Sequence, residues 1–317
     1  MSAPLKIVAP SIMRQFVEPL LPEGLALSWF NDPNEAIAMV RDAEVGWLDQ
    51  FSWNDSADAI FAGEKLKWVN TILAGLDMVP IDYVRQKGII ITNGRGLSSA
   101  AVADYAVMGI LNLAKGFADI VRAHDRREWL TQSPGTAELE GSSALIIGYG
   151  EIGGAIGTRL KAMNVQVTGV RRLADHADSI IGADEWRARL KEFDWVVLTA
   201  PATDDTRYML GAPELAAMKS GARLVNVARG SLIDQDALIA ALVSGSLAGA
   251  FLDVTMPEPL SKDDPLWSAP NILISMHMSG RSQSGISRKG AERFVENLRR
   301  YISGQPMISV VDLSKGY

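Results

Sequence analysis

The 317-residue chain contains no cysteine, so disulfide bonds, thiolate nucleophiles and thiolate metal sites are impossible. Histidine is also scarce, because only His124, His176 and His277 occur. No apolar run is long enough to span a bilayer, and the most apolar segment, residues 100–114, is interrupted by Asp104. The first residues lack the basic region and long apolar stretch of a signal peptide, so we expect a cytoplasmic protein.

An excess of positive charge is missing as well. The net charge of −6 gives no general attraction to nucleic acid or to anionic membranes, so we expect neither as a partner. Histidine and the acidic residues show no metal-ligand spacing, so we expect no metal. What is present is apolar: 48% of the residues are hydrophobic, and the length exceeds what one core normally supports. We therefore expect two domains.

The first hundred residues alternate short apolar runs with helical stretches, which is typical of parallel strands joined by crossover helices. A continuous helix is predicted over residues 98–122, long enough to connect two domains. The strands predicted before this helix span residues 6–9, 45–48, 68–72 and 88–92.

A second set of apolar runs follows, again separated mainly by helical segments. The predicted strands span residues 143–147, 166–170, 195–199, 223–227, 249–253 and 272–275. Six such strands fit a doubly wound parallel sheet. A helix over 285–303 and a strand-like run at 308–311 end the chain. These are too short for a domain, so we expect the last helix to pack on the first one. The predicted class is α/β, with two Rossmann-like doubly wound domains.

A glycine-rich turn lies between the predicted strand 143–147 and a helical segment. Its glycines are Gly148, Gly150 and Gly153, in the pattern GxGxxG. Glycine at these places permits a tight turn, close approach of a diphosphate to the backbone, and close packing of helix on strand. A plain strand-to-helix turn is the alternative. The strand–turn–helix context favours dinucleotide binding.

The next predicted strand ends at Arg171 and Arg172, where folds that prefer NAD usually have an acidic residue. Guanidinium groups form strong, potentially bidentate bonds to a 2′-phosphate. The pair therefore favours NADP(H), with NAD(H) still possible. A solvated basic pair on a loop is the alternative.

Three residues follow predicted strands and would lie at the carboxyl edge of the sheet. Arg229 could hold a carboxylate and polarise a neighbouring carbonyl group. If Glu258 and His277 meet, the carboxylate would stabilise the imidazolium, and His277 could act as a general acid. Each also has a structural alternative: an ion pair for Arg229, a solvated loop residue for Glu258 and a buried histidine for His277.

These motifs closely resemble the D-2-hydroxyacid dehydrogenases, in particular the NADPH-linked glyoxylate and hydroxypyruvate reductases. The resemblance covers nearly the whole chain. It is carried by residues 148–153, by Asn226-Val227-Ala228-Arg229-Gly230, by Asp253-Val254 with Pro257-Glu258-Pro259-Leu260, and by Pro265-Leu266-Trp267 before His277 and Gly280. It implies a substrate domain of residues 1–98 and 282–317 and a dinucleotide-binding domain of residues 99–281.

The resemblance also implies roles for further residues. Backbone N–H groups at Ala74, Gly75 and Leu76 would hold the substrate carboxylate, although a plain turn is the alternative there. Two departures from the family are Asp104, where glutamate is common, and Met276, where many members have proline. Cofactor contacts are implied at Gly148, Gly150, Glu151, Ile152, Gly153, Arg171, Arg172, Pro201, Thr206, Ala228, Asp253, His277 and Gly280.

The function so predicted is reduction of a small 2-oxo acid by NADPH to the D-2-hydroxy acid. Arg229 and loop 74–76 would hold the substrate, closure about hinges near 98 and 282 would exclude water, and His277 would donate the proton. We also expect a homodimer, because Trp129 lies where related reductases place an arm that contacts the other subunit; a core or surface tryptophan is the alternative. The rival functions are a formate dehydrogenase relative, which pairs its histidine with glutamine instead of glutamate, and a dinucleotide-sensing binding protein.

Overall fold

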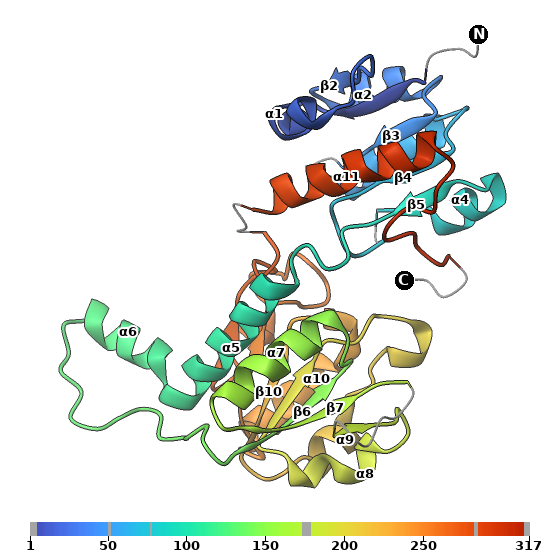
Figure 1. Cartoon of the computed structure of the whole chain (residues 1–317). Helices are drawn as coiled ribbons and strands as arrows, with labels where there is room; N and C mark the ends of the chain where they lie inside the picture. Colours follow the sequence, from blue (N-terminus) through green and yellow to red (C-terminus); the bar gives the residue numbers. More distant parts are fainter. Residues whose placement is uncertain (1–4, 50–51, 77, 173–178, 282–284, 314–317) are drawn as a thin grey trace. The chain divides into compact units, whose positions relative to one another are not determined.

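The computed structural model describes residues 5–49, 52–76, 78–172, 179–281 and 285–313. The chain divides into two compact units, which are drawn in Figure 1. Unit 1 comprises residues 1–98 and 283–317, and unit 2 comprises residues 99–282. Unit 1 is therefore built from two separate stretches of sequence.

Unit 1 contains a five-stranded sheet in the order β2-β1-β3-β4-β5, with every described strand pair parallel. This is the flavodoxin-like order, with the direction of winding reversing between β1 and β3. The strands are β1 (Ile7–Pro10), β2 (Ser28–Phe30), β3 (Val45–Trp47), β4 (Trp68–Asn70) and β5 (Ile90–Thr92). The helices are α1 (Arg14–Val17), α2 (Pro33–Val40), α3 (Trp53–Ala62), α4 (Ile81–Lys87) and α11 (Ile286–Ile302).

Alternate strand residues of unit 1 point to two separate cores, because side chains in a strand alternate between its faces. Val8 joins the core under α2 and α3, whereas Ile7 joins the core covered by α11. In that second core the ring of Phe294 lies 5.0 Å from the ring of Trp47 and 5.4 Å from that of Trp68. The last helix thus packs on unit 1, as the sequence predicts.

Unit 2 contains a seven-stranded parallel sheet in the order β12-β11-β10-β9-β6-β7-β8. Its strands are β6 (Ser143–Ile147), β7 (Gln166–Val170), β8 (Ile180–Ile181), β9 (Trp195–Leu198), β10 (Ala222–Asn226), β11 (Leu247–Leu252) and β12 (Ile272–Ile274). Its helices are α5 (Ser99–Lys115), α6 (Phe117–Asp125), α7 (Glu151–Ala162), α8 (Trp186–Arg189), α9 (Ala212–Ala217) and α10 (Gln235–Val243).

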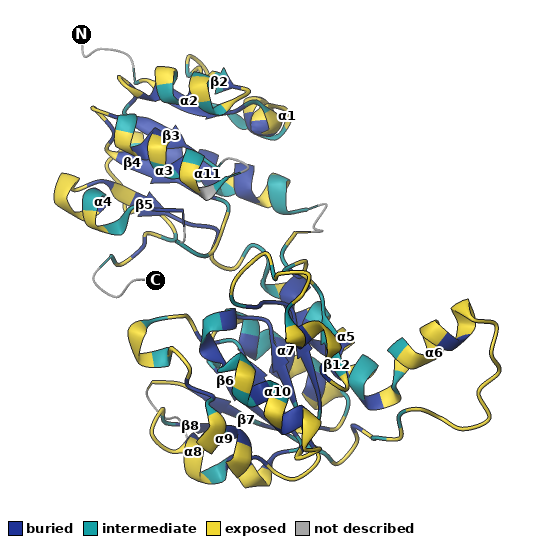
Figure 2. Cartoon of the chain, turned by 180° about the vertical axis from the view of Figure 1, so that it is seen from behind, coloured by how far each residue is buried: buried dark blue, intermediate teal, exposed yellow. Residues whose placement is uncertain are grey.

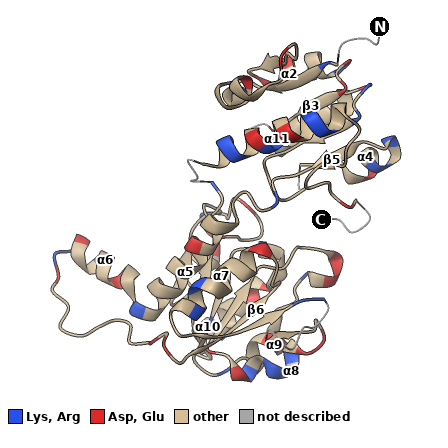
Figure 3. Cartoon of the chain, in the orientation of Figure 1, with Lys and Arg blue, Asp and Glu red and all other residues tan. Residues whose placement is uncertain are grey.

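The inner strands β6, β9, β10 and β11 are buried on both faces, as parallel strands between helix layers must be, whereas the edge strand β12 is half-buried. Leu145 and Ile147 face the core covered by α8, α9 and α10, whereas Ala144 and Ile146 face the core covered by α5 and α7. The inner strands are drawn mostly in the buried colour in Figure 2, and the strands are almost without charge in Figure 3; Arg223 is the one charged residue within the described strands. The predicted class, two doubly wound parallel sheets with a discontinuous first domain, is confirmed.

The strand order of unit 2 reverses between β6 and β9, since β7 lies on one side of β6 and β9 on the other. In open α/β sheets, ligands bind outside the carboxyl ends of the strands at such a switch point. The turn after β6 and the loop after β9 therefore mark the place where a ligand of unit 2 is expected.

The predicted single helix over 98–122 is wrong. Gly116 adopts φ +59° and separates α5 from α6, because a left-handed residue cannot continue a right-handed helix. A Cβ at Gly116 would lie 2.8 Å from the carbonyl carbon of Pro134, so the returning chain requires glycine there. No described helix has the length and apolar character needed to cross a membrane.

Three short segments also differ from the sequence-based expectation. The strands β2 and β8 were not predicted, because three and two residues are too short to show a period. The run 308–311 forms no strand; it makes one isolated antiparallel bridge between Thr92 and Val310.

Candidate active site

The three glycines of the turn between β6 and α7 are needed for different physical reasons. Gly148 has φ +97°, and a Cβ there would collide with the backbone of Ala200. A Cβ at Gly153 would lie 2.7 Å from the carbonyl oxygen of Gly148, so α7 could not pack closely. At Gly150, however, a Cβ would meet nothing closer than 4.0 Å. Packing within the protein therefore does not require glycine at this position. A diphosphate that lies against the backbone does require glycine there, so the turn fits a dinucleotide.

The turn is also anchored to the neighbouring strand β9. The Thr199 hydroxyl, directly after β9, donates to the carbonyl oxygen of Gly148 at 2.9 Å. Glu151, which is exposed, and Ile152, which is half-buried, begin α7. Their backbone N–H groups belong to the first turn of a helix, where anions are favoured. Thr199 was not singled out from the sequence, although its position at the end of a predicted strand could have indicated a role.

Arg171 and Arg172 directly follow β7, and both are exposed. The Nε of Arg171 donates to the carbonyl oxygen of Tyr149 at 2.5 Å. The predicted cationic pair therefore lies next to the glycine-rich turn, within the same unit. His176, which follows this pair in the sequence, lies outside the described residues.

The loop after β9 carries Pro201 and Thr206. The Thr206 hydroxyl donates to the Pro201 carbonyl oxygen at 2.8 Å and accepts from the Thr203 backbone N–H at 2.8 Å. The hydroxyl thus holds the loop in shape at the switch point of the sheet, while Pro201 is exposed.

Arg229 follows β10 and is half-buried. The side chain of Asn226 holds the backbone around it, accepting from the Ala228 N–H at 3.0 Å and donating to the Arg229 carbonyl oxygen at 2.9 Å. The Arg229 Nη1 donates to the Ala228 carbonyl oxygen at 2.7 Å. Both backbone and guanidinium are therefore fixed at the carboxyl end of the sheet.

The structure brings His277 and Glu258 together. His277 Nδ1 lies 2.6 Å from Glu258 Oε2, and Glu258 Oε1 accepts from the Thr255 backbone N–H at 3.0 Å. An ionised carboxylate only accepts hydrogen bonds, so Nδ1 carries a proton and Nε2 is the ring nitrogen that this contact does not use. The two side chains are 29% and 28% exposed, so a ligand can reach the pair.

The charge state of Glu258 results from opposing effects. Burial alone would raise the pKa of its carboxyl group, but hydrogen bonds from His277 and Thr255 outweigh that effect, and the pKa is lowered. The positive charge of Arg229 acts in the same direction. Arg229, Glu258 and His277 therefore form one electrostatic group at the ends of β10, β11 and β12.

Asp253 organises the loop that carries His277. Its side chain is 1% exposed and accepts from the Ser275 hydroxyl at 2.6 Å and from the backbone N–H of Met278 at 2.9 Å. The Ser279 N–H bonds both carboxylate oxygens, at 3.2 and 3.3 Å. The His277 N–H donates to the Asp253 carbonyl oxygen at 2.5 Å. The carboxylate predicted as a cofactor contact is thus used mainly to hold the loop that ends at Gly280.

Many family members have proline at the position of Met276, and the backbone there does not suit proline. Met276 and His277 adopt φ values of +53° and +56°. Proline is locked near φ −65°, so it could not replace Met276 in this backbone. The residue type and the loop shape therefore agree with each other.

The predicted carboxylate-binding loop follows β4 in unit 1. The Asn93 side chain donates to the Ala74 carbonyl oxygen at 2.7 Å, and the Gly94 N–H donates to the Leu73 carbonyl oxygen at 2.8 Å. Among the hydrogen bonds of the described residues, none uses the N–H groups of Ala74, Gly75 or Leu76. Such N–H groups suit an anion. Asp77 and the predicted hinge position 282 lie outside the described residues.

A second buried carboxyl group, missed by the sequence analysis, lies beside this loop. Asp49 follows β3, and its Oδ2 accepts from the Ile72 N–H at 2.7 Å and from the indole N–H of Trp47 at 2.8 Å. Within the described part of the chain its Oδ1 is buried without a hydrogen-bond partner. Asp49 therefore supports the start of the loop at Ile72.

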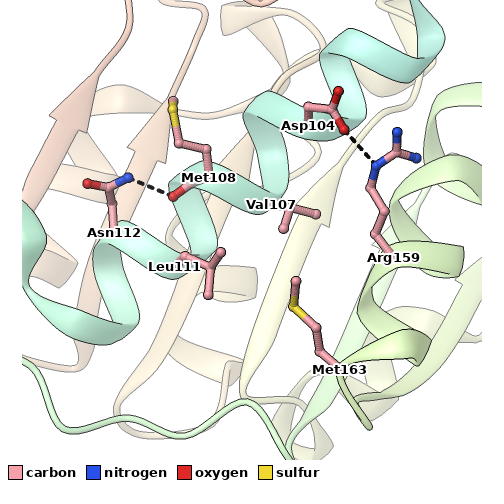
Figure 4. A pocket seen from close by; sticks show the side chains of 7 residues that line it. All are labelled: Asp104, Val107, Met108, Leu111, Asn112, Arg159 and Met163. Carbon is pink, nitrogen blue, oxygen red and sulfur yellow. Dashed lines mark hydrogen bonds and ion pairs between the residues drawn. The ribbon is translucent and has the colours of Figure 1, made fainter.

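A pocket of about 470 Å³ between α5 and α7 is lined by none of the predicted catalytic, substrate-binding or cofactor-binding residues (Figure 4). Asp104 forms an ion pair with Arg159 there at 2.8 Å, which gives the shorter carboxylate a contact within unit 2. The remaining lining is mostly apolar: Val107, Met108, Leu111, Asn112 and Met163.

Comparison with known proteins agrees with this geometry. The model of the D-isomer specific 2-hydroxyacid dehydrogenase NAD-binding domain matches residues 107–279. A glyoxylate reductase of Korarchaeum cryptofilum is 31% identical over 256 residues, which cover 78% of this chain and 77% of that protein. A D-3-phosphoglycerate dehydrogenase of Methanocaldococcus jannaschii is 29% identical over 284 residues, covering 88% of this chain but 53% of that protein. The chain thus spans about half the length of this last relative.

Solved structures extend the likeness to both units. The NADPH-dependent glyoxylate/hydroxypyruvate reductase of Sinorhizobium meliloti, in complex with NADP and malonate, has a TM-score of 0.80 at 25% identity and covers 98% of each chain. The matched family model contains the glycine-rich turn, Arg229, Glu258 and His277. From the fold, the site and these matches together, the chain belongs to the D-isomer specific 2-hydroxyacid dehydrogenase family.

Proposed function

We propose that the chain is an NADPH-dependent reductase that converts a small 2-oxo acid, such as glyoxylate, hydroxypyruvate or a larger analogue, into the D-2-hydroxy acid. The observation that carries the proposal is the 2.6 Å contact between His277 Nδ1 and Glu258 Oε2, in the sheet that also carries the glycine-rich turn. Such a pair is a general acid held in one tautomer. Unit 2 would bind the dinucleotide, and unit 1 would supply the loop for the substrate carboxylate.

The protein groups would divide the work as follows. The bound nicotinamide would supply hydride to the carbonyl carbon. Arg229 would hold the substrate carboxylate and draw electron density towards the carbonyl oxygen. The N–H groups of Ala74, Gly75 and Leu76 would bind the same carboxylate. His277 Nε2–H would donate its proton to the developing alkoxide oxygen, and Glu258 would stabilise the charged ring meanwhile.

The preference for NADPH is supported by Arg171 and Arg172, which are exposed at the end of β7 beside the turn. A similar protein is described as NADPH-dependent and as bound to NADP. We expect the double variant Arg171→Ala/Arg172→Ala to raise KM for NADPH about tenfold or more, with little change for NADH. An equal rise for both cofactors would remove the 2′-phosphate role.

The reaction is tested first by following oxidation of NADPH and of NADH with glyoxylate, hydroxypyruvate and phenylpyruvate. Turnover with NADPH favoured supports the proposal as a whole. Cofactor binding without turnover of any acceptor would favour the alternative, a dinucleotide-sensing protein. A formate dehydrogenase-like activity is disfavoured, because Glu258 stands where that relative has glutamine; oxidation of formate would reverse this.

We also propose that the enzyme is a cytoplasmic homodimer. The support lies in α6 and the segment after it, which expose Trp129 to 94% and Phe117 to 51%. Within α6 only Ala123 is buried, as the yellow colour of α6 in Figure 2 indicates. Large apolar side chains in such a segment are typical of a subunit contact.

A further inference from the structure

The ring of Tyr149, between the first two glycines of the turn, packs against unit 2. A Cβ at Gly169 in β7 would lie 2.5 Å from Tyr149 Cγ, and a Cβ at Gly157 in α7 would collide with Tyr149 Oη. Tyr149 is half-buried and packs on the core under α5 and α7. Strand and helix thus each have a glycine at the place where this ring lies, so its position is closely defined.

Arg171 is attached to Tyr149 by two separate contacts. Its Nε donates to the Tyr149 carbonyl oxygen at 2.5 Å, and its guanidinium carbon lies 5.7 Å from the centre of the Tyr149 ring. The main chains are joined as well, because the Tyr149 N–H donates to the Val170 carbonyl oxygen at 2.8 Å. The first contact orients the guanidinium plane, and the second lies within the distance at which an aromatic face attracts a cation.

These contacts use the inner edge of the guanidinium group. Within the described part of the chain, Nη1 and Nη2 of Arg171 take part in no hydrogen bond. Those two nitrogens form the edge that can bond two oxygens of one phosphate group. An exposed arginine without such support would occupy many rotamers, and a ligand would have to order it on binding. Tyr149 therefore orders the side chain before the ligand arrives.

We infer that Tyr149 is a positioning residue for cofactor selectivity: its ring and carbonyl oxygen present Arg171 to the 2′-phosphate of the dinucleotide. This inference rests on the proposed NADP(H) preference. It assigns a specific task to the residue between the first two glycines of the turn. The selectivity is thus set by two neighbouring strands acting together, and not by Arg171 alone.

The test uses two matched probes, adenosine 2′,5′-bisphosphate and adenosine 5′-monophosphate (AMP), which differ only in the phosphate at the 2′ position. Their Kd values are measured by calorimetry on the full chain, without any turnover. We expect Tyr149→Leu, which keeps the backbone carbonyl oxygen and removes only the aromatic ring, to weaken binding of the bisphosphate about fivefold to tenfold and binding of AMP by less than about twofold. Tyr149→Phe keeps both the ring and the carbonyl oxygen and serves as the control, with wild-type Kd values for both probes.

The route through Arg171 is tested by combining variants. If Tyr149 acts through Arg171, adding Tyr149→Leu to Arg171→Ala should produce no further loss of bisphosphate affinity. Equal weakening of both probes by Tyr149→Leu would overturn the inference and leave Tyr149 a structural role in the turn. An additional loss in the double variant would overturn it too. If Arg171→Ala itself leaves the ratio of the two Kd values unchanged, it is the proposed 2′-phosphate role of Arg171 that fails.

Discussion

At the residue scale, the charge of Glu258 decides what His277 can do. Its lowered pKa keeps the carboxylate ionised throughout the neutral range, and its stabilising interaction is lost only as pH falls through that lowered value. We expect Glu258→Gln to lower kcat about 10²-fold, because a neutral amide stabilises the imidazolium far less. Steady-state rates with the best 2-oxo acid measure this. Binding of NADP(H) should stay unchanged.

The matched control for this prediction is Glu292→Gln on α11, where an exposed glutamate loses the same charge. It should leave kcat at the wild-type value. If Glu258→Gln keeps full turnover, or if His277→Ala does, the pair is not the acid of the reaction and the proposed mechanism is wrong.

The pKa of the Asp49 carboxyl group is shifted in the opposite direction to that of Glu258. Burial raises the pKa of its carboxyl group, and the hydrogen bonds from the Ile72 N–H and the Trp47 indole offset this only in part. A raised pKa means that the stabilising contribution is complete below the unfolded-state pKa and is lost as pH rises through the folded-state value. Asp49→Asn removes this loss while its amide oxygen still accepts both hydrogen bonds. We therefore expect the variant to have a higher Tm than wild type at about pH 7 and a nearly equal Tm at about pH 4.

Asp194→Asn provides a control of opposite sign. Burial would raise the pKa of Asp194, but its bonds to Lys219 and Ser143 outweigh that, and the pKa is lowered. The stability that Asp194 contributes is present above its ordinary pKa, so this variant should lower Tm at about pH 7 and differ less at about pH 4. A lower Tm of Asp49→Asn at neutral pH would contradict the view that Asp49 is a destabilising buried carboxylate.

The residues found from the sequence and those missed differ in one physical respect. Arg229, Glu258 and His277 follow apolar strands, so the rule that ligands bind at carboxyl ends of parallel strands selects them. Asp49 follows a strand too, but the structural role of its carboxyl group depends on the burial of one oxygen atom, Oδ1. The inferred role of Tyr149 depends on its packing against Gly157 in α7 and Gly169 in β7. Neither burial nor contact is visible in a local pattern.

At the scale of elements too, the features with a local sequence pattern were predicted, and those that depend on distant contacts were missed. The strands β6 and β7 begin and end where the sequence predicts, because buried parallel strands are continuous apolar runs. The break at Gly116 was missed because one glycine in an apolar helical pattern does not by itself end a helix. The chain that returns at Pro134 determines the break, and it is far away in sequence.

This break leads to a prediction about stability. At Gly116 an added Cβ would meet both an unfavourable φ of +59° and the backbone of Pro134 and Gly135, at 2.8 and 2.9 Å. We expect Gly116→Ala to lower the free energy of unfolding by about 2 kcal/mol or more, of which the left-handed backbone accounts for about 1–2 kcal/mol. Urea unfolding measures the change.

Gly88→Ala separates the two contributions. Gly88 has a similar φ of +66°, but a Cβ there would have nothing within 4 Å. Its variant should lose only the backbone part. Equal losses for the two variants would show that the contact with Pro134 and Gly135 contributes nothing to the break between α5 and α6.

At the scale of the whole molecule, the two units share one architecture but carry different groups. The carboxyl edge of the sheet in unit 2 carries the glycine-rich turn and the Glu258–His277 pair. The corresponding edge in unit 1 carries backbone N–H groups and one buried carboxyl. A fold of parallel strands collects loops at one edge, so chemistry contributed by distant parts of the sequence meets there.

The segment that contains α6 exposes several large apolar side chains: Phe117, Ile120, Val121, Trp129 and Leu130. An isolated helix of nine residues is marginal in water, and Trp129 is 94% exposed, so in the proposed homodimer this segment would gain stability from the partner surface. A buried tryptophan at a subunit interface commonly contributes 2 kcal/mol or more, which corresponds to about 30-fold in the dimer Kd. We therefore expect Trp129→Glu to shift the protein from dimer towards monomer.

Light scattering across a dilution series measures this shift, with the wild type at twice the 34.3 kDa of one chain and the variant approaching that single mass. Val243→Glu is the matched control, because Val243 on α10 is also an exposed apolar residue, at 68%, but lies outside the α6 segment. A wild type that is monomeric at all concentrations would remove the homodimer. A Trp129→Glu variant that stays dimeric would instead keep the dimer and exclude Trp129 as its anchor, because a charge buried in an apolar contact cannot be tolerated without a partner.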